Sequence, residues 1–399
     1  MINQKLQALK QTFDQQFQSE KKRDKRLFFA PGRVNLIGEH TDYNGGFVFP
    51  CAITNGTYAL AAKRNDNQIR MYSMNFAAAG VKKFSLQQLD YNQEDDWANY
   101  PKGMLAKCIQ AGQEITSGFD VVFYGNIPNG AGLSSSASIE LATGAMLQGL
   151  YELTVDRVKM AKLGQLVENE FIGVNSGIMD QFAISMGKKN HGILLDCHSL
   201  EYEYAPLNFK DYSLLIMNSN KERTLASSKY NERREECETA LRLIQQEKQV
   251  EALGELSAEA FEQVEYLLKE EAVRKRARHA VTENERTKES LRQLKAGNLE
   301  GFGKLMNESH MSLRDDYEVT GQELDTLAEA AWEQDGVIGA RMTGAGFGGC
   351  AIAIVEKDKT EQVKQAIQKI YKARLGYEAS FYEAAAGDGA KECTEEVMT

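Results

Sequence analysis

The run from Pro31 to Tyr43 concentrates side chains that could bind a polar ligand and stabilise charge. Within ten residues it places one guanidinium, two carboxylates and an imidazole, from Arg33, Glu39, Asp42 and His40, between glycine and proline punctuation. Neither an amphipathic helix nor a strand requires this pattern. A site that binds a polyhydroxylated ligand and holds a cation beside a transferring phosphate does require it, because such a site needs both acceptors and a fixed positive charge.

A second motif, residues 128–137, reads Pro-Asn-Gly-Ala-Gly-Leu-Ser-Ser-Ser-Ala and lies between a predicted strand and a predicted helix. Gly130 and Gly132 permit a positive φ and a close approach of the backbone. The loop amides and the helix N-terminus would then offer N–H donors and partial positive charge to a phosphate. The run is neither a P-loop, since it lacks the Gly-Lys-Ser/Thr ending, nor a dinucleotide fingerprint. Taken alone, it is also compatible with a plain turn and a serine N-cap.

Two carboxylates accompany a third motif, residues 173–181, in which two glycines bracket a turn. Asp180 follows Gly177 by about one helical turn, and a carboxylate there is also compatible with simple stabilisation of the helix dipole. Glu168 flanks an apolar helical stripe, and on its own it reads as a solvated helix residue.

A fourth motif, residues 343–350, places four glycines within 344–349 between two predicted strands. So many glycines suggest a backbone that approaches another surface closely, although a wide β-turn is the alternative. Together with the loop at Gly130, this motif predicts a nucleotide cleft between two domains. Tyr230 lies on a charged helix, where an isolated tyrosine usually serves packing.

The elements that position these motifs follow from hydrophobic periodicity and turn residues. The first half predicts helices at 4–19, 156–171 and from about 135 and 176, and strands at 27–30, 46–53, 57–63, 68–73, 119–125 and 192–196. The second half predicts helices at 224–246, 257–267, 271–296, 298–307, 321–334 and 359–375, and strands at 212–217, 337–342, 350–355 and 379–384. This change of texture predicts a mixed α/β domain over residues 1–205 and an α+β domain over 206–399.

The composition limits the possible partners and compartment. The 399 residues carry 47 basic and 57 acidic side chains, a net charge of −10, which disfavours a nucleic acid or an anionic membrane as the main partner. Six cysteines lie far apart, as expected of thiols in a reducing compartment. We find no signal-peptide pattern in residues 1–26, no apolar run of membrane-spanning length and no heptad seam. The expectation is a soluble, cytoplasmic monomer.

The run 31–43 resembles, nearly letter for letter, the opening signature of galactokinases, a branch of the GHMP sugar and metabolite kinases. Motifs at 128–140, 173–182, 227–234 and 343–350 resemble the family's other motifs in the same order, with Ser176 where many relatives have cysteine. The resemblance implies the two-domain GHMP kinase fold, a mixed α/β protein with a ribosomal-protein-S5-like N-terminal domain, a ferredoxin-like C-terminal domain and an active site in the cleft. It also implies ATP-dependent phosphorylation of the C1 hydroxyl of D-galactose with Mg²⁺, giving α-D-galactose 1-phosphate and ADP, the first committed step of galactose catabolism.

The same resemblance assigns roles to individual residues. Asp180 would act as catalytic base, or would orient the hydroxyl, and Arg33 would stabilise the developing charge. The sugar would be bound by Glu39, His40, Thr41, Asp42, Gly177 and Tyr230. The nucleotide would be bound by Ser73, Gly130, Ala131, Gly132, Leu133, Ser134, Ser135 and Ser136. Magnesium would be held by Ser136 and Glu168.

Two alternatives stay open. A sister kinase could use N-acetylgalactosamine, arabinose or galacturonate, and the loop from Asp42 to Pro50 with the wall near Tyr230 would decide between these sugars. A galactose sensor without catalysis is the second alternative. Such relatives lose residues within the Ser-Ser-Ser-Ala stretch, which is complete here at residues 134–137 and favours an enzyme.

Overall fold

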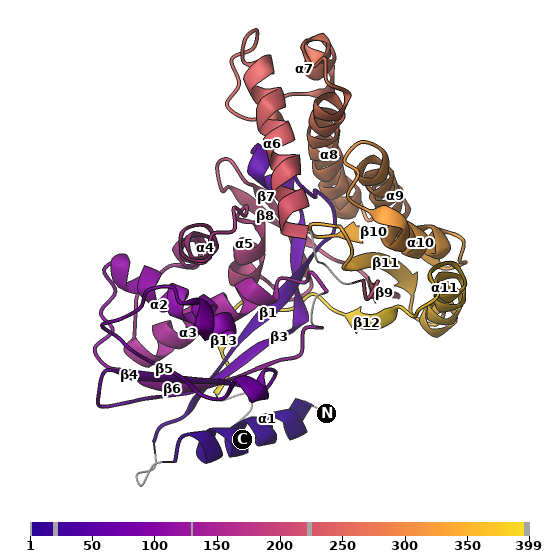
Figure 1. The fold of residues 1–399 in the computed structure, drawn as a ribbon. Coiled ribbons are helices and arrows are strands. Elements are labelled where there is room, and N and C mark those ends of the chain that lie inside the picture. Colours follow the sequence, from indigo (N-terminus) through magenta and orange to yellow (C-terminus); the bar gives the residue numbers. More distant parts are fainter. Residues whose placement is uncertain (1, 19–22, 129–130, 222–225, 395–399) are drawn as a thin grey trace.

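The computed structural model describes residues 2–18, 23–128, 131–221 and 226–394, and it builds the first half of the chain around a six-stranded sheet (Figure 1). The strand order is β13-β1-β3-β6-β4-β5, from β1 Arg26–Asn35, β3 Pro50–Lys63, β4 Gln68–Ser73, β5 Lys82–Ser85, β6 Phe119–Gly125 and β13 Lys391–Glu392. Neighbouring strands are antiparallel except β4 and β6, which are parallel.

Helices cover both faces of this sheet. One face packs against α2 Asn99–Gln110, α3 Ser135–Tyr151, α4 Arg157–Leu166 and α5 Met179–Met186, and the other against α1 Ile2–Gln16. Successive strand residues point to opposite faces, so Val121 of β6 joins the core under α3 while Val122 packs with Leu9 and Phe13 of α1. The sheet is therefore buried on both sides.

The second half contains a four-stranded antiparallel sheet of order β10-β11-β9-β12. Its strands are β9 Tyr212–Asn218, β10 Val337–Thr343, β11 Cys350–Glu356 and β12 Ser380–Ala384, and a smaller sheet joins β2 Phe47–Val48, β7 His191–Asp196 and β8 Tyr202–Pro206. The helices are α6 Ala226–Ile244, α7 Ala258–Glu262, α8 Glu271–Lys295, α9 Leu299–Asp315, α10 Gly321–Trp332 and α11 Thr360–Leu375. Short 3₁₀ turns span Asp42–Asn44, Ala77–Ala79, Gln93–Ala98, Leu253–Glu255 and Glu265–Leu267, and a π turn spans Val167–Ile172.

The two halves share a hydrophobic core. Leu215 of β9 faces the helices of the second half, whereas its neighbour Ile216 packs with Val34 and Phe49 of the first half. Because the four-stranded sheet is buried on both faces, it fixes β1 and the loop that follows β1 against the second half.

Most predicted elements are present, with some differences at their ends. Helix 298–307 extends to Asp315, helix 257–267 divides into α7 and a 3₁₀ turn, and helix 156–171 ends as α4 at Leu166 and continues as the π turn. The sequence did not predict α2, β5, β8 or β13. In α2, Pro101 and Gly103 look like helix breakers, although proline is tolerated in the first turn of a helix.

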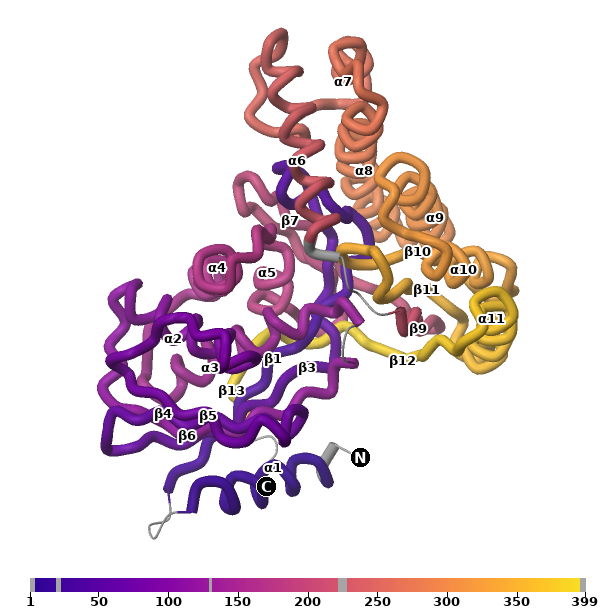
Figure 2. The backbone as a smooth tube through the Cα atoms, in the orientation of Figure 1, coloured from indigo at the N-terminus to yellow at the C-terminus, as the bar shows by residue number. Residues whose placement is uncertain are grey.

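The division into residues 1–205 and 206–399 stays a prediction, but the end of the chain returns to the first sheet. Figure 2 shows the C-terminal segment running from β12 to β13 beside β1, where Phe28 pairs with Glu392.

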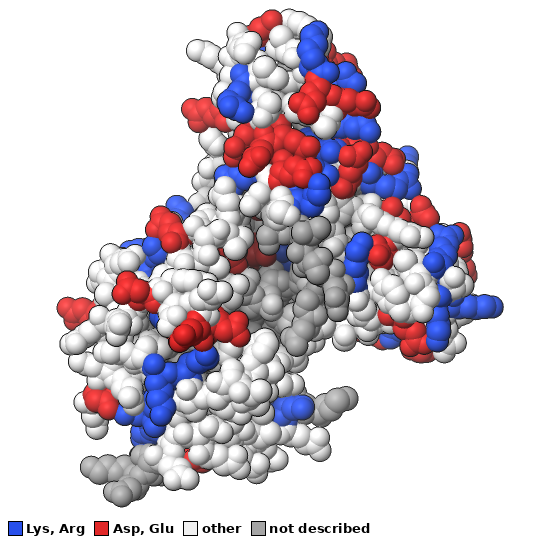
Figure 3. Space-filling model, in the orientation of Figure 1, with Lys and Arg blue, Asp and Glu red and all other residues white. Residues whose placement is uncertain are grey.

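Acidic and basic side chains are interspersed over the helical part around α6 to α8 on the face shown in Figure 3. No helix among the described residues has both the length and the apolar character needed to span a membrane.

Candidate active site

Side chains from three separate parts of the chain meet at the carboxylate of Asp180, in the first turn of α5. Arg33 on β1 donates from Nε to Asp180 Oδ1 at 2.8 Å, and its Nη2 lies 2.7 Å from the same oxygen. Ser134 donates from Oγ to Asp180 Oδ2 at 2.6 Å. The side chain of Arg33 is 5% exposed and that of Asp180 is 29% exposed, so a buried guanidinium supports a carboxylate that stays open to a ligand.

The local backbone explains why Arg33 reaches this position. A register shift between Pro31 and Arg33 interrupts the pairing of β1 with β3. A Cβ at Gly32 would lie 2.7 Å from the carbonyl oxygen of Leu133, so only glycine allows the loop before α3 to approach β1. Arg33 holds that loop through its backbone N–H, 3.2 Å from Leu133 O, and through Nη1, 2.9 Å from Gly132 O.

Ser134 and Ser135 form the start of α3. Ser134 has a left-handed backbone, with φ of 61°, and its side chain makes no capping hydrogen bond because it bonds Asp180 instead. The first N–H groups of a helix have no intrahelical partner, so the N-terminus of α3 can donate to an anion. Ser135 is exposed at this end, as a phosphate-binding residue would be.

A second hydroxyl and carboxylate meet at Ser136, two residues after Ser134. Ser136 donates from Oγ to Glu168 Oε1 at 2.8 Å. Glu168 lies on the π turn, a deviation that often occurs at functional sites. Burial raises the pKa of Glu168, and the nearby charge of Asp180 adds to that rise. Hydroxyl and carboxylate oxygens are ligands that Mg²⁺ accepts, and it uses few of them from protein, so this pair fits the predicted metal.

Asp42 and Gly177 lie together at a cavity of about 420 Å³. A Cβ at Gly177 would lie 1.8 Å from Asp42 Oδ2, so the glycine leaves the space that this carboxylate occupies. Burial raises the pKa of Asp42 to about 6, and repulsion from Asp180 contributes to the increase. Gly177 and Ile178, which line the cavity, lie three and two residues before Asp180 in the chain.

Four aromatic residues, His40, Tyr43, Tyr230 and Tyr317, form what we call the aromatic wall. The ring of His40 lies 5.5 Å from Tyr230 and 4.7 Å from Tyr317, and Tyr43 lies 5.4 Å from Tyr230, between ring centroids. Burial lowers the pKa of His40 to about 3, so the ring is neutral. Its Nε2 lies 3.2 Å from the carbonyl of Ala345 and must donate, which leaves Nδ1 to accept from the Tyr43 hydroxyl at 2.8 Å.

Two other residues of the predicted sugar loop are engaged within the protein. Glu39 is 1% exposed; its Oε1 accepts from the backbone N–H of Gly344 at 2.6 Å, and its Oε2 accepts from Asn35 Nδ2 at 2.6 Å and lies 2.8 Å from Arg341 Nη1. Thr41 is buried, and its hydroxyl bonds backbone carbonyls of the same loop. Glu39 therefore holds the C-terminal glycine loop, in addition to any contact with a sugar.

The two glycine loops lie side by side, as the sequence predicted. Gly344 has a φ of 84°, and a Cβ there would lie 3.1 Å from the carbonyl oxygen of Gly132. Sequence reasoning missed Arg341, which anchors this loop through Glu39, and Tyr317 of the aromatic wall. A charged residue inside the apolar strand β10 was the available signal for Arg341.

Three of the remaining residues predicted to bind the nucleotide, Ser73, Ala131 and Leu133, are described by the structure. Ala131 and Leu133 are buried in the core that joins the two halves, so only their backbone can face a ligand. Ser73 is buried at the end of β4, where its Oγ accepts from the backbone N–H of Asn75 at 3.3 Å. Gly130 lies outside the described residues.

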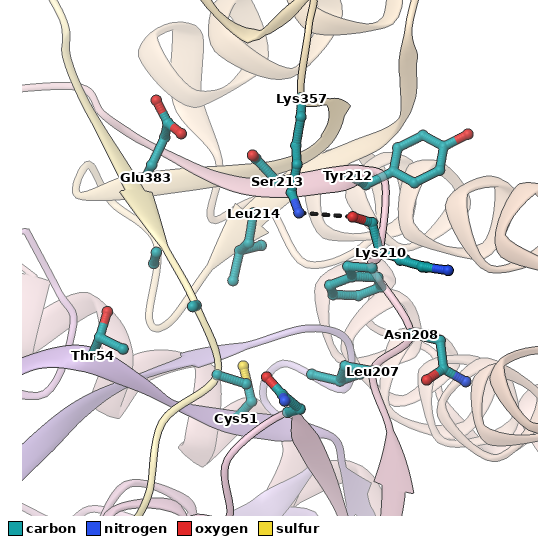
Figure 4. Close-up of a pocket in the computed structure, with 15 residues that line it drawn as sticks. Cys51, Thr54, Leu207, Asn208, Lys210, Tyr212, Ser213, Leu214, Lys357 and Glu383 are labelled. Atoms are coloured by element: carbon teal, nitrogen blue, oxygen red, sulfur yellow. Dashed lines mark hydrogen bonds between the residues drawn. The ribbon is translucent and has the colours of Figure 1, made fainter.

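A separate cavity of about 780 Å³ lies between the end of β8 and the strands β9 and β12 (Figure 4). Its lining includes Cys51, Lys357 and Glu383, and Lys357 Nζ donates to the carbonyl of Lys210 at 2.7 Å. None of the predicted site residues that the structure describes lines this cavity.

Family models match three parts of the chain. The Galactokinase galactose-binding signature matches residues 11–63, the GHMP kinases N terminal domain matches 99–188, and the GHMP kinases C terminal model matches 290–373.

Similar proteins and structures cover almost the whole chain. A galactokinase from Exiguobacterium sibiricum is 57% identical over 98% of this chain and 99% of its own, and one from Fusobacterium nucleatum is 57% identical over 91% and 94%. The structure of Lactococcus lactis galactokinase complexed with galactose has a TM-score of 0.94 and 51% identity, over 97% of this chain and 99% of its own. Mevalonate kinase from Methanococcus jannaschii, at 21% identity and a TM-score of 0.66 over 93% of this chain and 100% of its own, shares the fold.

Proposed function

The chain belongs to the galactokinase family of the GHMP kinases, and on that premise we propose that it transfers the γ-phosphate of ATP to the C1 hydroxyl of D-galactose. The observation that carries the proposal is the open carboxylate of Asp180, held between Arg33 and Ser134. Ser134 ends the loop before α3, which we call the phosphate loop, and Asp180 lies two residues after Ile178, which lines the cavity of Asp42. A sugar hydroxyl and a triphosphate can meet at that point.

Sugar recognition needs acceptors for several hydroxyl groups. Asp42 supplies a carboxylate at the cavity, and Tyr230 adds a hydroxyl and an aromatic face from α6. A carboxylate that bridges two neighbouring hydroxyls distinguishes an axial from an equatorial one, because the wrong epimer leaves a polar group unpaired. His40 holds the loop that carries Asp42 through the aromatic wall and the carbonyl of Ala345, and Glu39 holds it through the backbone N–H of Gly344. Gly177 leaves room for the Asp42 carboxylate.

Asp180 receives or orients the proton of the C1 hydroxyl. As the C1 oxygen bonds the γ-phosphorus, the bond from that phosphorus to the β,γ-bridging oxygen breaks, ADP leaves with the bond's electron pair, and the hydroxyl proton passes to the Asp180 carboxylate. Arg33 keeps that carboxylate fixed and stabilises charge on the transferring group, since a guanidinium remains charged and donates in a fixed fork. Ser134 fixes the second oxygen.

The nucleotide is bound by backbone groups and by serine hydroxyls. The N-terminus of α3 with Gly132 and Ser135 receives the phosphates, and Gly344 closes the opposite side. Ser136 and Glu168 would hold Mg²⁺, which supplies charge neutralisation between the phosphate groups when bound. That the protein acts as a cytoplasmic monomer remains a prediction.

A coupled assay of ADP release over a panel of sugars tests the proposal. The panel contains galactose, N-acetylgalactosamine, arabinose, galacturonate and glucose, and each sugar is also titrated calorimetrically. ATP-dependent turnover confined to galactose supports the proposal. Preferred turnover of another sugar would indicate a sister kinase, and galactose binding without ADP release would indicate a sensor.

A further inference from the structure

Two buried polar side chains beside the site have no role in the chemistry above. Glu140 on α3 and Gln181 on α5 are both fully buried. Gln181 donates from Nε2 to Glu140 Oε2 at 3.4 Å. The second carboxyl oxygen of Glu140, Oε1, and the amide oxygen of Gln181, also Oε1, are buried and have no hydrogen-bond partner among the described residues.

Two unpaired acceptors on neighbouring side chains are unfavourable, because a buried polar group that loses water and gains no partner destabilises the fold. An ionised carboxylate can only accept hydrogen bonds, so it cannot satisfy the amide oxygen. A protonated carboxyl has one O–H donor, and with it both unpaired oxygens become partners. The pair then has one hydrogen bond in each direction.

We propose that Glu140 is a carboxylic acid in the folded protein and forms a two-way hydrogen-bonded pair with Gln181 that joins α3 to α5. The surroundings agree with a neutral group. The charged and titratable groups that act on Glu140 are Glu168 from the π turn, Asp180 from α5 and Tyr100 from α2. Burial and repulsion from Glu168 and Asp180 raise the pKa of Glu140 well above its usual value.

The pair is well placed to position the active site. Glu140 follows Ser136 by about one turn of α3, and Gln181 directly follows Asp180 on α5. On the other side, a Cβ at Gly164 of α4 would lie 2.9 Å from the Gln181 side chain, so Gln181 has little room to move. Glu140 and Gln181 are therefore positioning residues that set the distance between α3, whose N-terminus faces the phosphates, and the carboxylate of Asp180. This consequence rests on the proposed function, whereas the pairing itself does not.

Infrared spectroscopy of the whole protein in ²H₂O tests the pairing without reference to activity. A protonated carboxyl has a C=O stretching band separate from those of carboxylates and amides. At neutral pH this band should be present in the wild type, absent in Glu140→Gln, and retained in Glu300→Gln, which makes the same change at an exposed position of α9. A wild-type spectrum unchanged by Glu140→Gln would overturn the proposal.

Matched variants test the positioning role. Glu140→Gln keeps a donor toward Gln181 and should retain most of kcat, whereas Glu140→Leu should lower kcat about 100-fold, the loss that a displacement of about 1 Å can cause, with little change in either KM. The reciprocal swap Glu140→Gln with Gln181→Glu restores an acid and an amide and should recover activity and the infrared band. Should Glu140→Leu fail to fold, the thermal stability and kcat of the swap against Gln181→Glu alone give the same comparison.

The outcomes separate the two proposals. Equal loss of kcat in Glu140→Gln and Glu140→Leu, or a lower Mg²⁺ affinity in Glu140→Gln, would contradict the acid–amide pair and favour an ionised carboxylate. A wild type that shows the infrared band but no phosphorylation of galactose would leave the pair in place and refute the proposed function.

Discussion

Replacing Arg33 with lysine should separate the two tasks that this guanidinium performs. In the structure its Nε and Nη2 contact Asp180 Oδ1, while its Nη1 donates to the carbonyl of Gly132 in the phosphate loop. Lysine keeps the charge but places it at a single point, so it cannot hold the carboxylate and the loop with one rigid plane.

The magnitude follows from the contacts that lysine loses. One ammonium can replace one contact to Asp180, which leaves at least one hydrogen bond to a charged group unmade and the Gly132 carbonyl unpaired. Hydrogen bonds to charged groups contribute about 1.5–3 kcal/mol, so a total loss of about 3 kcal/mol is expected. That corresponds to a decrease in kcat/KM of about two powers of ten.

A double-mutant cycle with Ser134→Ala provides the assay. Ser134 and Arg33 bind opposite oxygens of Asp180, so their effects on kcat/KM for galactose should be non-additive by at least 0.5 kcal/mol. Arg314→Lys, at an arginine paired with Asp315 away from the site, is the matched control and should combine additively with Ser134→Ala. Near-normal kcat/KM in Arg33→Lys, or strict additivity with Ser134→Ala, would refute the account of Asp180 as held from both sides.

Four further predictions concern the sugar, the metal and the pH dependence of activity and stability. Gly177→Ala should raise the KM for galactose at least tenfold and leave the KM for ATP nearly unchanged, since its Cβ would lie 1.8 Å from Asp42 Oδ2; equal effects on both substrates would argue against a sugar-specific cavity. Glu168→Gln and Ser136→Ala should each lower the apparent affinity for Mg²⁺ by about 10- to 100-fold, measured by titrating the metal against turnover at saturating ATP. An unchanged titration would exclude these residues from the metal site. Because the pKa of Asp42 is raised from 3.8 to about 6, kcat/KM for galactose should fall about tenfold per pH unit below pH 6 as this acceptor is protonated. For the same group the folded state binds more protons than the unfolded state, so the wild type should lose stability relative to Asp42→Asn as the pH rises from about 4 to 6, measured by thermal unfolding; parallel melting curves would contradict the raised pKa.

The sequence predicts the elements that carry the motifs because their periodicity is local. Strand β6 matches the prediction residue for residue, and α3 begins at Ser135, near which a helix was predicted to start; these two elements bracket the phosphate loop. The missed elements depend on distant partners. β13 is only two residues long and exists because Phe28 and Phe29 of β1 offer it an edge, which no local pattern reveals.

The sequence predicted a set of candidate site residues, but it did not predict the contacts that the structure shows between them. The sequence placed Ser134 with the nucleotide, whereas the structure directs its hydroxyl to Asp180, 46 residues away. Glu39 was predicted to bind sugar, and that role stays a prediction. Its contacts with Arg341 and Gly344 join residues more than 300 positions apart in sequence, so they depend on how the two halves pack together. Pairings over such distances follow from the assembled core, not from the spacing within one motif.

The central claim is that Asp180 accepts or orients the proton of the attacking sugar hydroxyl, and Asp180→Asn tests it most directly. Single-turnover phosphorylation of galactose should be measured beside calorimetric titrations of galactose and of MgATP on the same preparation. We expect phosphorylation to be abolished while ATP binding stays nearly intact, because the amide keeps the shape of the carboxylate but cannot take up the proton. Near-normal phosphorylation by Asp180→Asn would contradict the account.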